Sequence, residues 1–130
     1  MRLFLFIVLF TCNYLFAGDT TEVKEAKPKI LYGTASYYSN SFNGKKTANG
    51  EIYSHKKMTA ACNVLPLGTW IRVTNLRNGK SVVVKTNDRL HSKMKRVVDL
   101  SREAAEKLGY VKSGLTRVRV EVIGKKKPEK

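Results

Sequence analysis

KTNDRLHSKMKRVVDL, residues 85–100, is the stretch around which the rest of the chain is organised. It carries two acids, Asp88 and Asp99, and each lies beside a short run of valines, residues 82–84 and 97–98, that predicts a strand. The segment between the acids is basic and polar, which is typical of an exposed loop. Loops held by a rigid sheet often carry catalytic and binding groups, so this stretch is the first candidate for a site.

Two interpretations of the pair of acids stay open at this point. In the plain one, one aspartate caps a turn and the other pairs with a nearby arginine. In the functional one, the two strands deliver both carboxyl groups into one groove, where the repulsion of like charges makes one acid easier to protonate. Arg89 follows Asp88 directly and would oppose that effect if its side chain points towards the acids.

The composition indicates one basic domain with short appendages. The chain has 130 residues, of which 42% are hydrophobic, which is enough for a single core. Its 25 Lys and Arg against 10 Asp and Glu give a net charge of +15, which indicates an anionic partner or surface. Nucleic acid is the usual anionic partner, but the N-terminal sequence argues against it.

The N-terminal segment predicts export. Residues 1–16, MRLFLFIVLFTCNYLF, are a basic residue and an apolar run shorter than the roughly 20 residues that span a bilayer. Ala17 and Gly18 supply small residues for cleavage, so residues 1–17 are predicted to be a signal peptide. We therefore expect an exported protein of the periplasm or cell envelope, with no nucleic-acid partner. In the alternative interpretation, Cys12 is lipidated and anchors the chain to a membrane.

Composition divides the rest of the chain. Residues 18–29 are polar and predict a flexible tether, residues 30–124 the folded domain, and residues 125–130 a basic tail. Cys62 has no partner once Cys12 is lost, and is interpreted as a small buried hydrophobe rather than a nucleophile. The two histidines show no metal-ligand spacing, so we expect no metal, and we expect no other cofactor. We also expect a monomer.

The folded domain has a β-rich pattern. Asn78-Gly79 predicts a hairpin turn, while Ser101 as N-cap and Gly109 as stop delimit one short helix. Residues 39–50, rich in Asn, Gly and Ser, predict a long loop. Alternation and β-branched residues predict strands at 30–38, 58–61, 71–74, 81–86, 97–98 and 117–122. Six short strands and one helix favour a mainly β, closed barrel, because closure removes exposed edges.

Seven short blocks in this order carry a resemblance to a known family. They are GTASYY (33–38), TANGE (47–51), TAA (59–61), LPLGT (65–69), RVTNL (72–76), NDR (87–89) and DLS (99–101). With them, residues 30–124 resemble the double-psi β-barrel domain of the rare lipoprotein A family of the bacterial cell envelope. The resemblance implies a six-stranded double-psi β-barrel with one short α-helix, and an endolytic lytic transglycosylase acting on peptidoglycan.

The resemblance also implies catalytic candidates. Asp88 matches the acid of the family's Asn-Asp-Arg block. Asp99, eleven residues later, matches a key acid of expansin-like relatives, and Glu51 matches the acid of the Ala-Asn-Gly-Glu block. Candidate substrate-binding residues are Ser36, Tyr37, Asn87, Arg89 and Cys62.

The chain departs from the family pattern at three places. The family often has Asp at the position of Ser54, His at the position of Cys62 and Gly-Pro at Leu90-His91. These departures concern activity rather than the fold, and those at Ser54 and Cys62 favour an alternative function. In that alternative the chain is a non-catalytic peptidoglycan-binding or expansin-like wall-loosening protein.

The chemistry of a lytic transglycosylase needs only one carboxyl group. The enzyme protonates the glycosidic oxygen and then removes a proton from the 6-hydroxyl of the same sugar, so one acid serves both steps. Hydrolysis normally needs two carboxyls flanking the bond. We favour Asp88 as this acid and base, with Asp99 as the close rival. The expected partners are peptidoglycan glycan strands and the anionic wall surface.

Overall fold

The structure is a computed structural model that describes residues 29–129. The predicted signal peptide, the Cys12 anchor and nearly all of the predicted tether lie outside these residues. Within them, no helix has the length and apolarity needed to cross a bilayer.

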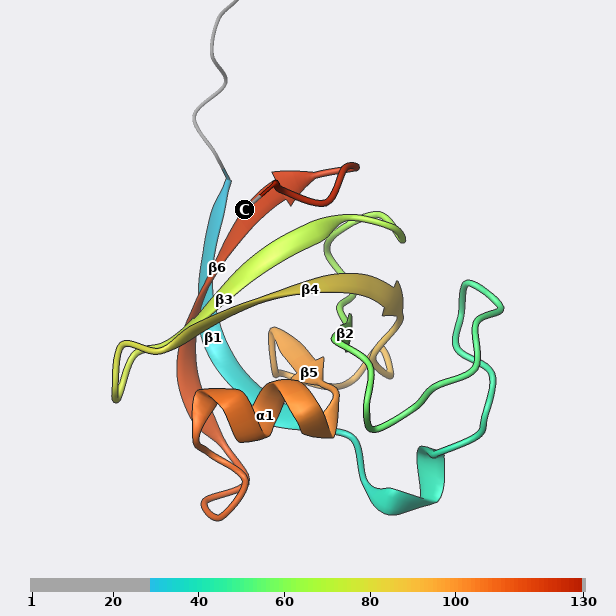
Figure 1. The fold of residues 1–130 in the computed structure, drawn as a ribbon, viewed down its shortest axis with the longest axis horizontal. Helices are drawn as coiled ribbons and strands as arrows, with labels where there is room; N and C mark the ends of the chain where they lie inside the picture. Colours follow the sequence, from blue (N-terminus) through green and yellow to red (C-terminus); the bar gives the residue numbers. More distant parts are fainter. Residues whose placement is uncertain (1–28, 130) are drawn as a thin grey trace, which may run out of the picture.

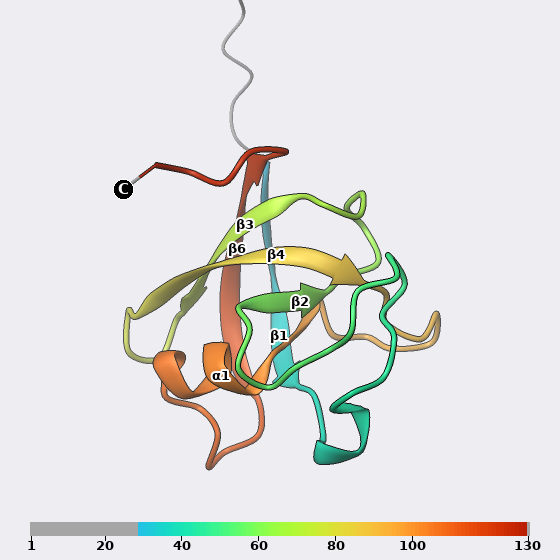
Figure 2. The ribbon, with the colours of Figure 1, turned by 45° about the vertical axis from the view of Figure 1, so that its right-hand side comes forward.

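Six strands close into one barrel in the order β1-β5-β2-β4-β3-β6 (Figures 1 and 2). The pairs β1–β5 and β2–β4 are parallel, and the other four are antiparallel. The strands are β1 (Ile30–Tyr37), β2 (Thr59–Ala61), β3 (Trp70–Asn75), β4 (Ser81–Asp88), β5 (Val98–Leu100) and β6 (Thr116–Gly124). The predicted closed, mainly β barrel is therefore confirmed.

The local signals for the helix and the hairpin are confirmed as well. The helix α1 (Arg102–Leu108) begins after Ser101, whose side chain accepts a hydrogen bond from the Ala104 amide at 3.3 Å. It ends at Gly109, which has a φ of 79°. That left-handed conformation is easy only for glycine.

The barrel core follows from the period of two along each strand. Nine inward-facing apolar side chains on the six strands have no exposed surface: Ala35, Ala60, Ile71, Val73, Val84, Val98, Leu100, Val118 and Val120. Burial of each valine, leucine or isoleucine contributes about 1.5–3 kcal/mol, so these positions fix which face of every strand points inward. On β5 this leaves Asp99, between two buried residues, pointing outward.

A bulge redirects the other acid. On β4 the side chains of Val82, Val84 and Thr86 point inward, so strict alternation would send Asp88 into the core. The register between β2 and β4 shifts after Ala60, which pairs with Thr86, so that the next residue, Ala61, pairs with Asp88. One extra residue on β4 thereby turns Asp88 to the outer face, as bulges often do near functional sites.

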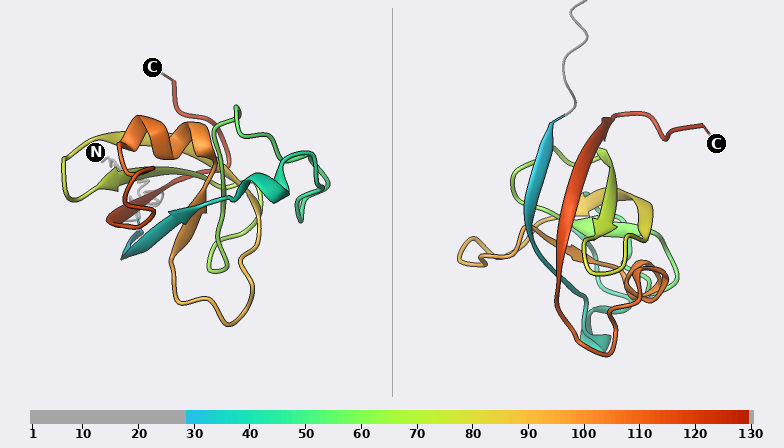
Figure 3. Two further views of the ribbon diagram at one scale, coloured as in Figure 1. Left: turned by 90° about the horizontal axis from the view of Figure 1, so that it is seen from below. Right: turned by 90° about the vertical axis from the view of Figure 1, so that its left-hand side faces the viewer.

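Two loops stand beyond the barrel (Figure 3). The first, residues 38–58, is longer than the predicted loop and contains the short 3-10 helix η2 (Asn40–Phe42) and a bridge between Lys46 and Ile52. The second, residues 89–97, connects β4 to β5. Strand β4 also runs two residues beyond its predicted end, because Thr86 and Asp88 pair with β2.

Candidate functional site

Ala61 lies between the two acids on the outer face of the barrel. It pairs with Asp88 of β4 on one side and with Asp99 of β5 on the other. Directly paired residues project from the same face, and neighbouring strands are 4.7–4.9 Å apart, so the Cα atoms of the acids are roughly 10 Å apart. The strands therefore place both acids in one row, separated by a methyl side chain.

This row lies along a groove of about 530 Å³. The groove is lined by Tyr37, Tyr38, Ser39, Phe42, Ala61, Asp88, Arg89, Leu90, His91, Met94, Arg96 and Asp99. A second hollow of about 400 Å³ adjoins it, since Tyr37, Tyr38 and Ser39 line both, and it includes Ser36 and Arg102. The predicted shared groove for the two acids is thus present.

Asp88 is held by three hydrogen-bond donors. The hydroxyl of Tyr38 donates to Oδ2 at 2.6 Å, and the amides of Ala48 and Arg89 each donate to Oδ1 at 2.9 Å. Burial, and next the hydrogen bond to Asp88, raise the pKa of Tyr38 well above its ordinary value. Tyr38 therefore keeps its proton near neutral pH and remains a donor to the acid.

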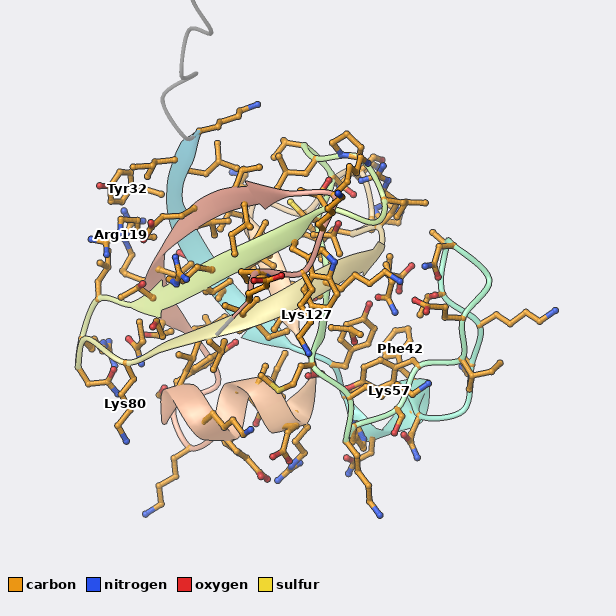
Figure 4. The ribbon with its side chains drawn as sticks, turned by 45° about the horizontal axis from the view of Figure 1, so that its top comes forward. Tyr32, Phe42, Lys57, Lys80, Arg119 and Lys127 are labelled. Atoms are coloured by element: carbon orange, nitrogen blue, oxygen red, sulfur yellow. The ribbon has the colours of Figure 1, made fainter. Side chains whose placement is uncertain are left out.

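Aromatic contacts hold Tyr38 in place. Its ring stacks on that of Tyr53 with centroids 4.0 Å apart and meets Phe42 edge-on at 5.6 Å. Figure 4 shows Phe42 turned from its loop towards the body of the barrel. The Tyr53 hydroxyl lies 2.8 Å from Nδ1 of His55 and accepts from the Arg102 amide at 3.2 Å. Burial raises the pKa of Tyr53. The stack is therefore fixed at both of its rings.

Asp99 has a different partner. The guanidinium of Arg96 donates to both carboxyl oxygens, from Nε to Oδ1 at 2.7 Å and from Nη2 to Oδ2 at 3.0 Å. The two side chains are only 27% and 16% exposed, and the hydrogen bond to Asp99 raises the pKa of Arg96. The plain interpretation, an aspartate paired with a nearby arginine, therefore holds for Asp99.

Arg89 does not oppose the acids through its side chain. Its guanidinium donates to the carbonyl oxygen of Cys62 at 2.6 Å and also to that of Leu65. Arg89 therefore fixes the segment after β2, and Arg96 is the arginine that meets a groove acid.

Glu51 and Asn87 lie behind the groove rather than on it. The Glu51 carboxylate accepts from the Asn49 side chain at 2.8 Å and from the Asn87 side chain at 3.2 Å, and Lys85 lies 3.5 Å away. The bonds from Asn49 and then Asn87, helped by Lys85, hold the pKa of Glu51 below its usual value. The amide of Asn49 donates to the Asn87 carbonyl at 3.1 Å, so this cluster ties the first loop to β4.

The other predicted site residues have separate environments. Cys62 is fully buried in the main core, and its amide donates to the Asp88 carbonyl at 3.0 Å. Ser36 pairs with Asp99 and lines only the adjoining hollow. Tyr37 lines both spaces, while its hydroxyl donates to the Val111 carbonyl at 2.8 Å. The structure thus brings Asp88, Asp99, Tyr37 and Arg89 to the groove.

Two groove residues carry more of the geometry than the sequence analysis assigned to them, namely Tyr38 and Arg96. Arg96 lies inside a run of basic residues, and its only signal is its place three residues before Asp99. Tyr38 is one of two adjacent tyrosines whose roles differ only in the folded chain. Among residues 29–129, no three His, Cys, Asp or Glu side chains gather as a metal site requires.

Comparison with known proteins identifies a family that matches most of the chain. The family described as lytic transglycolase matches residues 31–120. The endolytic peptidoglycan transglycosylase RlpA of Pseudomonas aeruginosa is 52% identical over 111 residues, which are 85% of this chain and 33% of that protein. The protein of the same name from Vibrio cholerae is 46% identical over 108 residues, 83% of this chain and 41% of that protein. The chain thus spans about a third to two fifths of the length of these two relatives.

Solved structures share the fold. An expansin of Clavibacter michiganensis superimposes with a TM-score of 0.60 at 21% identity, covering 78% of this chain and 53% of that one. At that identity the likeness concerns the barrel alone. This likeness agrees with the closed barrel of six strands.

Proposed function

Because this chain belongs to the lytic transglycolase family, we propose that it cuts peptidoglycan glycan strands endolytically and leaves 1,6-anhydro ends. The names of the relatives, each an endolytic peptidoglycan transglycosylase, support the substrate and the reaction. They also support a place of action in the cell envelope. The work of such an enzyme is the remodelling of the cell wall.

The observation that carries this proposal is the pair of acids in one open groove. Asp88 and Asp99 face the same space from either side of Ala61, and that space has apolar and aromatic walls suited to sugar rings. The partners of the acids favour different roles. Both oxygens of Asp99 are occupied by one guanidinium, whereas Asp88 has only neutral donors.

We therefore assign Asp88 as general acid and base. As the acid, it gives its proton to the glycosidic oxygen while the bond from that oxygen to C1 breaks and the departing sugar leaves as an alcohol. The remaining sugar carries positive charge at C1 and its ring oxygen. Its own 6-hydroxyl then attacks C1, and Asp88 as carboxylate takes the hydroxyl proton, which restores the acid. No water enters the product.

The remaining candidates receive supporting roles in this scheme. The negative charge of Asp99, oriented by Arg96, lies where it can stabilise the cationic sugar. Tyr37 and Phe42 offer apolar surface to sugar rings. Glu51 and Asn87 hold the first loop against β4, and Cys62 packs in the core beneath the groove. These three residues therefore affect the reaction only by maintaining the shape of the groove.

The direct test is mass spectrometry of purified peptidoglycan sacculi after incubation with the purified protein. We expect fragments with 1,6-anhydro ends. Fragments with reducing ends would mean hydrolysis. Undigested sacculi that retain the protein would instead support the non-catalytic, wall-loosening function, which the departures at Ser54 and Cys62 favour.

A further inference from the structure

We propose that Tyr38 is a positioning residue which confines the transferable proton of Asp88 to one oxygen, Oδ2, and sets how tightly that oxygen holds it. The inference rests on the proposed function for its consequence in catalysis. Its structural basis is the set of hydrogen bonds at one carboxyl group.

The two oxygens of Asp88 are not equivalent. A carboxylate has about four acceptor positions, two on each oxygen. On Oδ1 the amides of Ala48 and Arg89 fill both, and a backbone N–H donates but cannot accept. On Oδ2 the Tyr38 hydroxyl fills one position at 2.6 Å and leaves the other open. The proton of the neutral acid therefore belongs on Oδ2.

Tyr38 acts on the same oxygen that gives and takes the proton. A hydrogen bond to an ionised carboxylate stabilises the charged form, and an O–H···O⁻ bond of this length is among the stronger ones. Once the proton has passed to the leaving sugar, Tyr38 stabilises the anion until the 6-hydroxyl returns a proton. The raised pKa of Tyr38 keeps its hydroxyl protonated throughout this cycle.

The position of the hydroxyl is fixed by packing. Tyr38 is 7% exposed, its ring lies between Tyr53 and Phe42, and its amide donates to the Leu100 carbonyl at 3.0 Å. These contacts oppose a movement of the ring away from the acid. Tyr38 is thus a preorganised donor, whose benefit requires no rearrangement during the reaction.

The other charged or titratable side chains around Asp88 are engaged elsewhere. Arg96 binds Asp99, the Arg89 guanidinium binds two carbonyl oxygens, and Glu51 is held by two amides. His91, at the groove rim, accepts from the Lys93 amide at 3.2 Å. Among residues 29–129, Tyr38 is the one residue whose side chain donates a hydrogen bond to the Asp88 carboxyl; the other two donors are backbone amides. A change confined to that hydroxyl therefore isolates its effect.

The experiment compares Tyr38→Phe with Tyr53→Phe in the full chain. Both variants keep the stacked rings and lose one buried hydroxyl, but the Tyr53 hydroxyl contacts His55 and the Arg102 amide instead of the acid. Carbon-13 NMR follows the Asp88 carboxyl as pH is changed. We expect the titration midpoint to rise by about one to two pH units in Tyr38→Phe, a tenfold to hundredfold gain in proton affinity, and to stay unchanged in Tyr53→Phe.

Turnover supplies a second readout. Activity that needs protonated Asp88 declines as pH rises, and in Tyr38→Phe this declining limb should move to higher pH. A merely structural loss would lower the rate at every pH without moving the limb. An unmoved NMR midpoint in Tyr38→Phe, or an equal rise in Tyr53→Phe, would overturn the inference.

Two further controls keep the result decisive. If Tyr38→Phe does not fold, site-specific 3-fluorotyrosine at position 38, a stronger donor, should lower the midpoint, and an unmoved midpoint would reject the inference. The NMR titration needs no turnover. A wild-type protein that yields no anhydro products would therefore refute the proposed function, while the midpoints still decide the role of Tyr38.

Discussion

Strand β4 with Asp88 forms one wall of the groove and β5 with Asp99 forms the other, and the two walls hold their aspartates in opposite ways. On the β4 wall, Asp88 accepts from two backbone amides and one buried tyrosine, all neutral donors fixed by the fold. On the β5 wall, Asp99 is held by one arginine from a loop, through a charged fork that occupies both oxygens. The β4 wall leaves its acid one open position for a proton, whereas on the β5 wall one guanidinium occupies both oxygens of the acid. Residue type alone therefore does not assign acid and base.

The largest expected effect tests the β4 wall. Asp88→Asn keeps an oxygen for the two backbone amides but loses the titratable proton. We expect product formation to fall about 10²- to 10⁴-fold, with folding and wall binding nearly intact, as is usual for a general acid. Mass spectrometry of anhydro products and a thermal unfolding scan check this. Full activity in this variant together with none in Asp99→Asn would exchange the roles of the two walls.

The next effect tests the β5 wall. Arg96→Gln leaves Asp99 without its charged partner, while Arg96→Gln with Asp99→Asn removes both charges. In a double-mutant cycle with Asp99→Asn, we expect a coupling of about 1.5–3 kcal/mol in the free energy of unfolding, measured with urea. We also expect Arg96→Gln to lower turnover. If this variant raised turnover instead, Asp99 would be the proton carrier.

A smaller effect concerns the support of the β4 wall. Cys62→Ser places a hydroxyl in the fully buried core position whose amide bonds to Asp88. We expect the free energy of unfolding to drop by about 1–2 kcal/mol while the products stay 1,6-anhydro ended. Loss of all turnover in a well-folded variant, with rapid labelling of the wild-type thiol, would point to a nucleophile.

The smallest effect separates Glu51 from the two groove acids. Its pKa is lowered in the folded chain, so its contribution to stability is present above the unfolded value near 4.5 and is lost as pH falls through the folded value. Glu51 is 43% exposed, so we expect Glu51→Gln to cost less than about 1 kcal/mol at pH 7. That difference should shrink towards pH 3. Urea unfolding at both pH values checks the sign, and a difference that grows on acidification would contradict it.

Local sequence signals predicted most of the fold. Alternation predicted the long strands, Asn78-Gly79 predicted the hairpin, and Ser101 with Gly109 predicted the helix. Each of these elements depends mainly on residues that are neighbours in the chain. The double-psi barrel was implied only by the family resemblance, and the order of the strands around it was not predicted. Strands β2 and β5 have three residues each, too few for a period to be visible.

The site was less predictable for two physical reasons. Alternation along β4 sends Asp88 inward, and only a register shift against β2 turns it into the groove. Arg96 lies in a basic run with Lys93 and Lys95, and its place three residues before Asp99 is the one local sign of its pairing. The register shift depends on pairing between β2 and β4, which lie far apart in sequence, so a pattern within one segment cannot reveal it.

The beginning of β1 and the end of β6 lie side by side, since the Val122 amide donates to the Lys29 carbonyl at 3.0 Å. This end of the barrel also carries Tyr32 and Arg119, on the far side from Phe42 (Figure 4). A short peptide could therefore join residue 29 to residue 125 and allow a circular permutation, with new termini cut in the turn at residues 76–80. The groove, built from the opposite ends of β1 and β4, would keep every one of its connections.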